Sequence, residues 1–285
     1  MKNNYSEAFR LKVGQGQAVP LIGAYDVFSA SLAARYYDGI FLSGFSFAAS
    51  FYGLPDIGYI SWSDIVSFTQ RVRAILPNHH IVVDMDDGYC DVEVACHVAR
   101  LLESSGASAI ILEDQKRPRR CGHMEGKQLL KIDEYLLKLQ NVLNSVDSLY
   151  VVARTDAVEH EDIIRRVHAI NDTSADAILV DGIRNIEILK EVRKITTKPL
   201  VFNQIYGGKS PRLSLSELTD LGVSIVNYST PCISSAQSAI SSTLEKLRND
   251  DGLLSPELAP GVTLSDCNGL LNQNVKMSRE SLVES

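Results

Sequence analysis

The chain is poor in cysteine, and its cysteines do not stand at the spacing of a metal or redox motif. Five cysteines occur in 285 residues, with no CxxC pair among them. An odd, unpaired set argues against both a disulfide framework and a cysteine-rich zinc site. Free thiols are typical of a reducing compartment, so we expect a cytoplasmic protein.

Long apolar runs and an excess of basic residues are also absent. The uncharged run 39–55 contains glycines and serines and is too short to span a bilayer. The polar N-terminal stretch lacks the apolar core of a signal peptide. Acidic residues outnumber Lys and Arg by 35 to 28, which gives a net charge of −7. Because nucleic-acid binding requires a basic face, we expect neither a nucleic-acid partner nor a membrane.

Short apolar runs rich in β-branched residues alternate with stretches of helical periodicity. The predicted strands are 20–24, 40–43, 80–85, 109–112, 149–154, 177–181, 200–203 and 224–228. Strands that are apolar on both faces and alternate with helices indicate a parallel sheet. Eight such units without a break in composition predict one α/β domain, a TIM-type (β/α)8 barrel. A doubly wound open sheet is the alternative.

We place the barrel at residues 1–247, because the sequence changes character after it. Residues 248–285 contain two prolines and several Gly, Asn and Ser residues, with only short helical patches. We expect a C-terminal extension that is helical or partly disordered. A position of this extension at a subunit interface is left open.

Nearly every predicted strand ends in polar side chains. The ends read Ser43-Gly44, Asp84-Met85-Asp86, Glu113-Asp114, Arg154-Thr155-Asp156, Asp181, Asn203 and Tyr228. Barrel enzymes carry their chemistry at the C-terminal ends of the strands. The pattern therefore predicts a shared polar site at one rim.

Three carboxylates at these ends form a candidate metal site. Asp84 and Asp86 are two residues apart and point to the same side if the strand continues. With Glu113 of the next strand they supply the hard oxygen ligands that Mg²⁺ or Mn²⁺ prefers. A DxD at a strand end also occurs as a loop or helix cap, so the spacing alone leaves that alternative open.

The segment 113–123 combines an acid, four cations and a Cys-Gly-His sequence. Its glutamate can hold a divalent metal, and its cations can bind an anionic substrate. Its thiol can exchange a proton. The combination indicates an enzyme.

A glycine-rich segment, 207–211, follows the seventh predicted strand. Backbone amides in such a segment can cradle a phosphate. The full P-loop or GxGxxG pattern is missing, so we expect a plain turn.

Taken in order, these motifs resemble the isocitrate lyase/phosphoenolpyruvate mutase superfamily over residues 8–235. The matching pieces are Ser43-Gly44, Gly53-Leu-Pro-Asp56, Asp84-x-Asp86, Glu113-Asp-Gln115, Arg120-Cys-Gly-His123, Gly126-Lys127 and Arg154-Thr-Asp156. The chain looks most similar to the short-chain branch, which contains methylisocitrate lyase, dimethylmalate lyase, the petal death protein and carboxyphosphonoenolpyruvate mutase. The ordered set is specific, whereas each piece alone is weak.

The resemblance implies Mg²⁺ at the strand ends, with Mn²⁺ as an alternative, and it assigns ligands by position. Asp84 is the implied main metal ligand, and the implied water-mediated shell consists of Asp56, Asp86 and Glu113. The residues implied to bind a small carboxylate substrate are Ser43, Gly44, Arg120, Gly122, Arg154, Asp181 and Asn203.

The resemblance also implies a mobile loop, 115–127, that carries the catalytic groups. Cys121 would be the general acid that protonates a carbanion, and nearby cations would lower its pKa into a useful range. Arg119 and His123 would act as cations that favour the charge of this carbanion.

These features predict a Mg²⁺-dependent carbon–carbon lyase. Its substrate would be a 2-hydroxy di- or tricarboxylate of the 2-alkylmalate or methylisocitrate type, cleaved by a retro-aldol route to an α-keto acid and a carboxylate. A mutase or hydrolase for a phosphonopyruvate-like substrate is one alternative, and a dicarboxylate-binding barrel without turnover is another. The resemblance further implies a homo-oligomer, a dimer or tetramer that exchanges its last helix.

Three positions depart from the pattern of the lyases. Arg119 stands where they usually carry lysine, and Asp181 where many carry glutamate. Phe41 stands near a tyrosine that is a candidate base in methylisocitrate lyase, and a phenyl ring cannot take a proton. Tyr25 and Tyr89 are the candidates to replace it.

Overall fold

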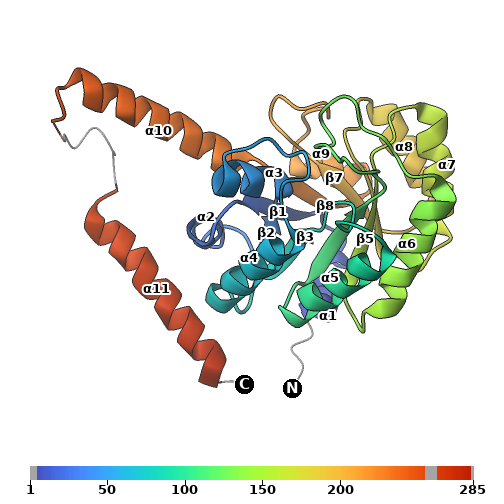
Figure 1. Ribbon diagram of the computed structural model, residues 1–285, viewed down its shortest axis with the longest axis horizontal. Coiled ribbons are helices and arrows are strands. Elements are labelled where there is room, and N and C mark those ends of the chain that lie inside the picture. Colours follow the sequence, from blue (N-terminus) through green and yellow to red (C-terminus); the bar gives the residue numbers. More distant parts are fainter. Residues whose placement is uncertain (1–4, 254–261, 284–285) are drawn as a thin grey trace.

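Eight parallel strands close into a barrel in the computed structural model, and helices surround it (Figure 1). The structure describes residues 5–253 and 262–283. The strands are β1 (Val19–Ala24), β2 (Gly39–Leu42), β3 (His80–Asp84), β4 (Ala109–Glu113), β5 (Tyr150–Thr155), β6 (Ala177–Val180), β7 (Leu200–Asn203) and β8 (Val223–Tyr228). Each strand pairs with the next, and β8 pairs with β1. The predicted (β/α)8 barrel is confirmed, and the doubly wound open sheet is wrong.

Helices alternate with the strands along the chain, and several of them begin where the sequence supplies a capping group. They are α1 (Tyr5–Val13), α2 (Val27–Ala33), α3 (Gly44–Phe47), the π-helix η1 (Ala48–Tyr52), α4 (Trp62–Ile75), α5 (Val92–Ser104), α6 (Ile132–Ser145), α7 (His160–Asn171), α8 (Ile186–Ile195), α9 (Leu215–Asp220), α10 (Pro231–Asn249) and α11 (Leu264–Val283). Ser61 and Asp64 form a reciprocal capping box at the start of α4, and Asp91 caps α5. These side chains bind amide groups that a first helical turn leaves unpaired.

The apolar core has one layer inside the barrel and another between the barrel and its helices. Alternate strand residues fill the interior, among them Leu21, Phe41, Val82, Ile111, Val152, Leu179, Val201 and Ile225. Phe9 of α1 joins this inner layer, and its ring lies 5.1 Å from that of Tyr150 in an edge-to-face arrangement. Because α1 covers the amino-terminal end of the barrel, a polar site has room only at the carboxyl ends of the strands.

The last two helices extend away from the layer around the barrel (Figure 1). None of the residues of α10 is buried, and the boundary expected at residue 247 lies within this helix. α11 runs back beside the barrel, where Leu270 is buried and Asn274 donates a hydrogen bond of 2.8 Å to Ser31 of α2. Within the described ranges, no helix has the length and apolar character that crossing a bilayer requires.

Candidate active site

The carboxyl ends of the strands enclose a small cavity, and most of the predicted site residues line it. Those in its wall are Ser43, Asp56, Asp84, Arg119, Cys121, Gly122, Arg154, Asp181 and Asn203. The strand ends explain this grouping, since Asp84 ends β3 and Asn203 ends β7. Ser43 follows β2 directly and caps α3, because its side chain accepts from the backbone N–H of Ser46.

Four further predicted residues lie just behind or beside this wall; they are Gly44, Asp86, Glu113 and His123. The backbone N–H of Gly44 points at Asp84 Oδ2 from 3.4 Å. A Cβ on Gly44 would lie 3.1 Å from both Asp84 Oδ2 and Asp86 Oδ1, so glycine is what lets the start of α3 approach the acids.

Arg120 is the predicted substrate ligand that the structure does not bring to the cavity. Its backbone N–H donates to Gln115 Oε1 at 2.9 Å, and its carbonyl accepts from Gln115 Nε2 at 2.6 Å. Its guanidinium stem lies beside Gly126. Arg120 therefore stabilises the conformation of the loop through its backbone.

Arg119 is buried and binds three carboxylates. Its Nε donates to Glu113 Oε1 at 2.6 Å, its Nη1 lies 3.2 Å from Asp86 Oδ1, and Nη1 also pairs with Asp56. Burial opposes the charge of this side chain, but Asp86 and Glu113 outweigh burial and hold the pKa of Arg119 well above its usual range. Arg119 is thus a permanent cation inside an acidic cluster.

The carboxylates around Arg119 keep oxygens that accept no hydrogen bond, although Asp86 Oδ1 lies 3.2 Å from Arg119 Nη1 and Glu113 Oε2 lies 3.3 Å from Arg154 Nη2. Neither side-chain oxygen of Asp86 accepts a hydrogen bond from a described residue, and neither does Glu113 Oε2. Burial raises the pKa of Asp84, and it raises those of Asp86 and Glu113 well above their usual range. The neighbouring arginines offset only part of this effect. Buried carboxylates in this condition are stabilised by a further cation.

This donor set fits a hard divalent ion that keeps part of its water shell. In the part of the chain that the structure describes, no three acidic, histidine or cysteine side chains are grouped so as to hold one metal ion. Mg²⁺ usually retains several waters and touches one or two carboxylates. Direct contact with Asp84 and water-mediated contact with the other acids is compatible with this spacing.

Arg154 forms a second buried network at the ends of β5, β6 and β7. Its Nη2 lies 2.7 Å from Asp181 Oδ2 and 3.0 Å from Asp156 Oδ1. Asn203 donates to Asp181 Oδ1 at 2.9 Å and accepts from Ser229 Oγ at 2.6 Å. Burial opposes ionisation of Asp181, but Arg154 outweighs it and holds the pKa of this carboxyl far below its usual range. Asp181 is therefore a fixed anion.

The loop 115–127, called the lid below, is closed over the cavity. The backbone N–H of Cys121 donates to Asp56 O at 2.9 Å, and Lys127 Nζ donates to Gly122 O at 2.6 Å. Gly122 lies so close to Asp181 that a Cβ on it would overlap the carboxylate. The cavity has a volume of about 20 Å³, which is room for about one water molecule. A dicarboxylate can enter only when the lid opens.

Cys121 is held as a neutral thiol. Burial raises its pKa to about 12, and the carboxylates of Asp56 and Asp181 add to the effect. The expectation that nearby cations lower this pKa is wrong, because Arg119 and Arg154 are each paired with several carboxylates. A thiol that stays protonated suits a proton donor.

Asp114 is a rim residue to which the sequence assigned no role. It accepts hydrogen bonds from Thr155 Oγ1 at 2.6 Å, from the backbone N–H of Asp156 at 2.9 Å and from Arg166 Nη1 at 2.9 Å. Burial raises its pKa to about 6. Asp114 anchors the end of β5, and strand alternation, which turns it away from the side of Glu113, is the signal of this supporting role.

No tyrosine lines the cavity within the described ranges, and the rings in its wall are those of Phe41 and Phe45. Burial raises the pKa of Tyr89 well above its usual range, and it also raises that of Tyr25. Both phenols therefore stay protonated at neutral pH. Neither residue replaces the missing tyrosine base at this site.

Known proteins are similar to this chain over most of its length. The family model described as phosphoenolpyruvate phosphomutase matches residues 10–248. The petal death protein of Dianthus caryophyllus is 32% identical over 261 residues, which cover 90% of this chain and 82% of that protein. The 2-methylisocitrate lyase of Bacillus subtilis (strain 168) is 33% identical over 237 residues, 81% of this chain and 77% of that protein. A crystal structure of 2,3-dimethylmalate lyase, titled as a PEP mutase/isocitrate lyase superfamily member, superposes with a TM-score of 0.89 and 25% identity, over 98% of this chain and 95% of that chain.

The enclosed thiol predicts slow alkylation of Cys121. With a pKa of about 12, only about one thiol in 10⁴ is ionised at pH 8. Iodoacetamide at pH 8 should therefore label the exposed Cys90 at least roughly tenfold faster than Cys121 in the folded protein, as measured by peptide mass spectrometry. In urea-unfolded protein the two rates should converge. Equal rates in the folded protein would contradict a buried, protonated thiol.

Proposed function

The chain belongs to the isocitrate lyase/phosphoenolpyruvate mutase superfamily, and we propose that it is a carbon–carbon lyase of this superfamily. It would cleave a 2-hydroxy di- or tricarboxylate by retro-aldol chemistry. The proposed substrate is of the 2-alkylmalate or methylisocitrate type, and the products are an α-keto acid and a second carboxylate. The observation that carries this proposal is the position of the Cys121 thiol, which the lid encloses in one wall with rim carboxylates and arginines.

Mg²⁺ is the proposed cofactor, with Mn²⁺ as a substitute. Asp84 would hold the ion directly, and Asp56, Asp86 and Glu113 would hold it through water. The oxygens of Asp86 and Glu113 that accept no hydrogen bond from a described residue support this assignment. A divalent ion supplies positive charge that stabilises the negative charge on the keto-acid half of the substrate during cleavage.

The other rim residues would bind and orient the substrate. Ser43, Gly44 and Arg154 are proposed to hold the keto-acid half, and Asn203 a further substrate oxygen. Arg154 is pre-oriented for this task, because two carboxylates already fix its guanidinium. Such fixed donors need no reorganisation when charge develops.

The lid would complete the site and keep water out of it. The substrate hydroxyl would give its proton to water before the lid closes. Cys121 would give its proton to the carbon that loses its bond, and the thiolate would regain a proton from water once the lid opens. His123 and the backbone of Gly122 would contact the departing carboxylate. Arg119, in the wall of the cavity, would balance the acidic cluster. Exclusion of water protects a carbanion from unproductive protonation.

The apolar part of the wall favours a substrate that carries an alkyl group. Its members are Phe41, Phe45, Ile111, Leu179 and Ile205. A phosphonate brings more negative charge, whereas the arginines of the wall are already paired. Relatives named 2-methylisocitrate lyase and 2,3-dimethylmalate lyase also support the alkylated substrates. A carboxyvinyl-carboxyphosphonate phosphorylmutase among the relatives keeps phosphonate chemistry as the second candidate.

We also propose that the chain forms a homo-oligomer, a dimer or tetramer, through its C-terminal helices. α10 buries none of its residues within the chain, and Ile240 and Leu244 on it are 58% and 59% exposed. A helix with exposed apolar side chains is stabilised when a second copy of the chain covers them. Light scattering should give the mass of two or four chains, and a monomer at micromolar concentration would contradict the proposal.

Turnover of alkylated hydroxy acids tests the proposed reaction. Purified protein with Mg²⁺ should release an α-keto acid from 2-methylisocitrate, 2,3-dimethylmalate or citramalate, and EDTA should abolish the release. Cys121→Ser should lower kcat by about 10²–10⁴, the usual contribution of a general acid. Cys90→Ser, a matched change at an exposed cysteine, should leave kcat unaltered.

Three outcomes separate the lyase from its alternatives. Failure of the folded, Mg²⁺-bound protein to cleave any of these acids would contradict the lyase. A new phosphorus NMR signal after incubation with phosphonopyruvate would support phosphonate chemistry instead. Binding of a dicarboxylate without turnover of either class would indicate a binding barrel.

A further inference from the structure

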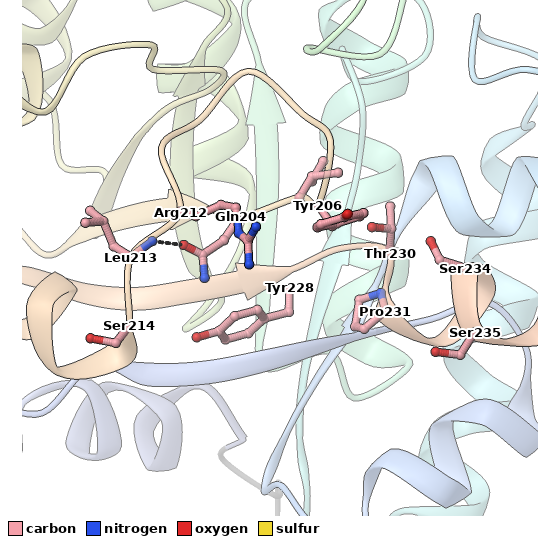
Figure 2. Close-up of a pocket in the computed structure, with 11 residues that line it drawn as sticks. Gln204, Tyr206, Arg212, Leu213, Ser214, Tyr228, Thr230, Pro231, Ser234 and Ser235 are labelled. Atoms are coloured by element: carbon pink, nitrogen blue, oxygen red, sulfur yellow. Dashed lines mark hydrogen bonds between the residues drawn. The ribbon is translucent and has the colours of Figure 1, made fainter.

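The connection between β7 and α9, residues 204–214 and called the arch below, stands at the rim beside the lid. Figure 2 shows the arch rising from Gln204 and returning to Leu213, with its base closed by the hydrogen bond between them. In this bond the backbone N–H of Leu213 donates to Gln204 Oε1 at 2.9 Å. A cavity of about 560 Å³ lies between the arch and the start of α10. The arch borders this cavity on one side, and it also contacts the lid.

Lys209 connects the arch to the lid at three points. Its backbone N–H donates to His123 Nδ1 at 2.9 Å. Its Nζ lies 2.8 Å from Glu125 Oε1 and donates to Met124 O at 3.3 Å. Gly208 permits this approach, because a Cβ there would lie 2.7 Å from His123 Nδ1.

The amide of Lys209 determines which ring nitrogen of His123 carries the hydrogen. A backbone N–H can only donate, so Nδ1 is the acceptor and the hydrogen of the ring resides on Nε2. A ring with an accepting Nδ1 carries no charge, so the expectation that His123 acts as a cation is wrong. Nε2 lies 3.5 Å from Asp181 Oδ1, which is too long for a full hydrogen bond, and it has no other partner among the described residues. The His123 side chain is only 10% exposed. A buried donor without a full partner is thus directed toward the Asp181 side of the cavity.

We propose that the Lys209 amide is a positioning group that holds His123 as an Nε2–H donor, and that the arch and the lid close over the substrate as one unit. The tautomer of the ring is independent of the reaction, whereas the contact with the substrate rests on the proposed lyase function. On closure, a carboxylate or carbonyl oxygen of the substrate accepts from Nε2–H and replaces the long contact with Asp181. The tautomer is set before the substrate arrives, so binding needs no rearrangement of the ring.

The Lys209 ammonium adds a second connection that the tautomer does not depend on. It reaches the lid two residues beyond His123, at Glu125, whose side chain is 79% exposed. Loss of this contact should loosen the lid without changing the ring. The two parts of Lys209 are therefore separable by substitution.

Two variants at position 209 make this separation. Lys209→Pro removes the backbone N–H, whereas Lys209→Ala, its matched control, keeps the N–H and removes the ammonium. Two-dimensional nitrogen–proton NMR of the histidine rings, with His123 assigned through His123→Gln, reports the tautomer. We expect the Nε2–H form in the wild type and in Lys209→Ala, and a shift toward the Nδ1–H form in Lys209→Pro. Gly208→Ala should produce the same shift by displacing the ring, and it serves if Lys209→Pro does not fold.

Kinetics with the best alkylated hydroxy acid report the consequence for catalysis. We expect kcat/KM to fall about 100-fold in Lys209→Pro, mostly through kcat, because a misplaced donor costs about this much. In Lys209→Ala it should fall less than about threefold, since an exposed ion pair contributes little. Faster hydrogen exchange of the lid amides in Lys209→Ala would show that the ammonium holds the lid.

Persistence of the Nε2–H form in folded Lys209→Pro and Gly208→Ala would overturn the proposal. Equal kcat/KM in Lys209→Pro and Lys209→Ala would overturn its catalytic part. If the wild type turns over none of the hydroxy acids, the proposed function fails, and the NMR result still decides the role of the Lys209 amide.

Discussion

One buried guanidinium connects the lid of this barrel to its rim. Arg119 belongs to the lid, whereas its partners Asp56, Asp86 and Glu113 belong to the strand ends and the segment after η1. Removing one partner of a buried ion pair leaves an uncompensated charge, which is much more destabilising than loss of an exposed pair. The pairing is also incomplete, because burial still holds the pKa values of Asp86 and Glu113 high. The rim therefore combines a fixed internal cation with capacity for a second one.

The chemistry of the lid follows from this charge balance. Since the arginines are paired with carboxylates, no free cation ionises Cys121, and burial keeps its thiol protonated. Under the closed lid the cavity has a volume of about 20 Å³, so substrate binding requires the lid to move. Gly122 allows the lid to pass within contact of Asp181. In this closed arrangement Cys121 lies in one cavity wall with Asp181 and the carboxylates Asp56 and Asp84.

The barrel and the location of its site could be predicted from the sequence, but the surroundings of individual side chains could not. Alternation of strands and helices is a local pattern, and barrel topology alone brings strand ends such as Asp84 and Asn203 to one rim. The pKa of Cys121 depends instead on where the neighbouring arginines point. Arg119 turns inward to carboxylates, and Arg120 does not line the cavity. The bond from Lys209 to His123 joins positions 86 residues apart, which no local pattern encodes.

The proposed function depends most on a divalent cation held by the buried rim carboxylates. Isothermal titration calorimetry with Mg²⁺ tests it directly on the wild type, on Asp84→Asn and on Asp38→Asn, a matched change at a carboxylate that is 74% exposed. We predict one ion per chain in the wild type and in Asp38→Asn, and affinity at least roughly tenfold weaker in Asp84→Asn. Absence of Mg²⁺ binding to the wild type, or equal affinity in Asp84→Asn, would contradict the account.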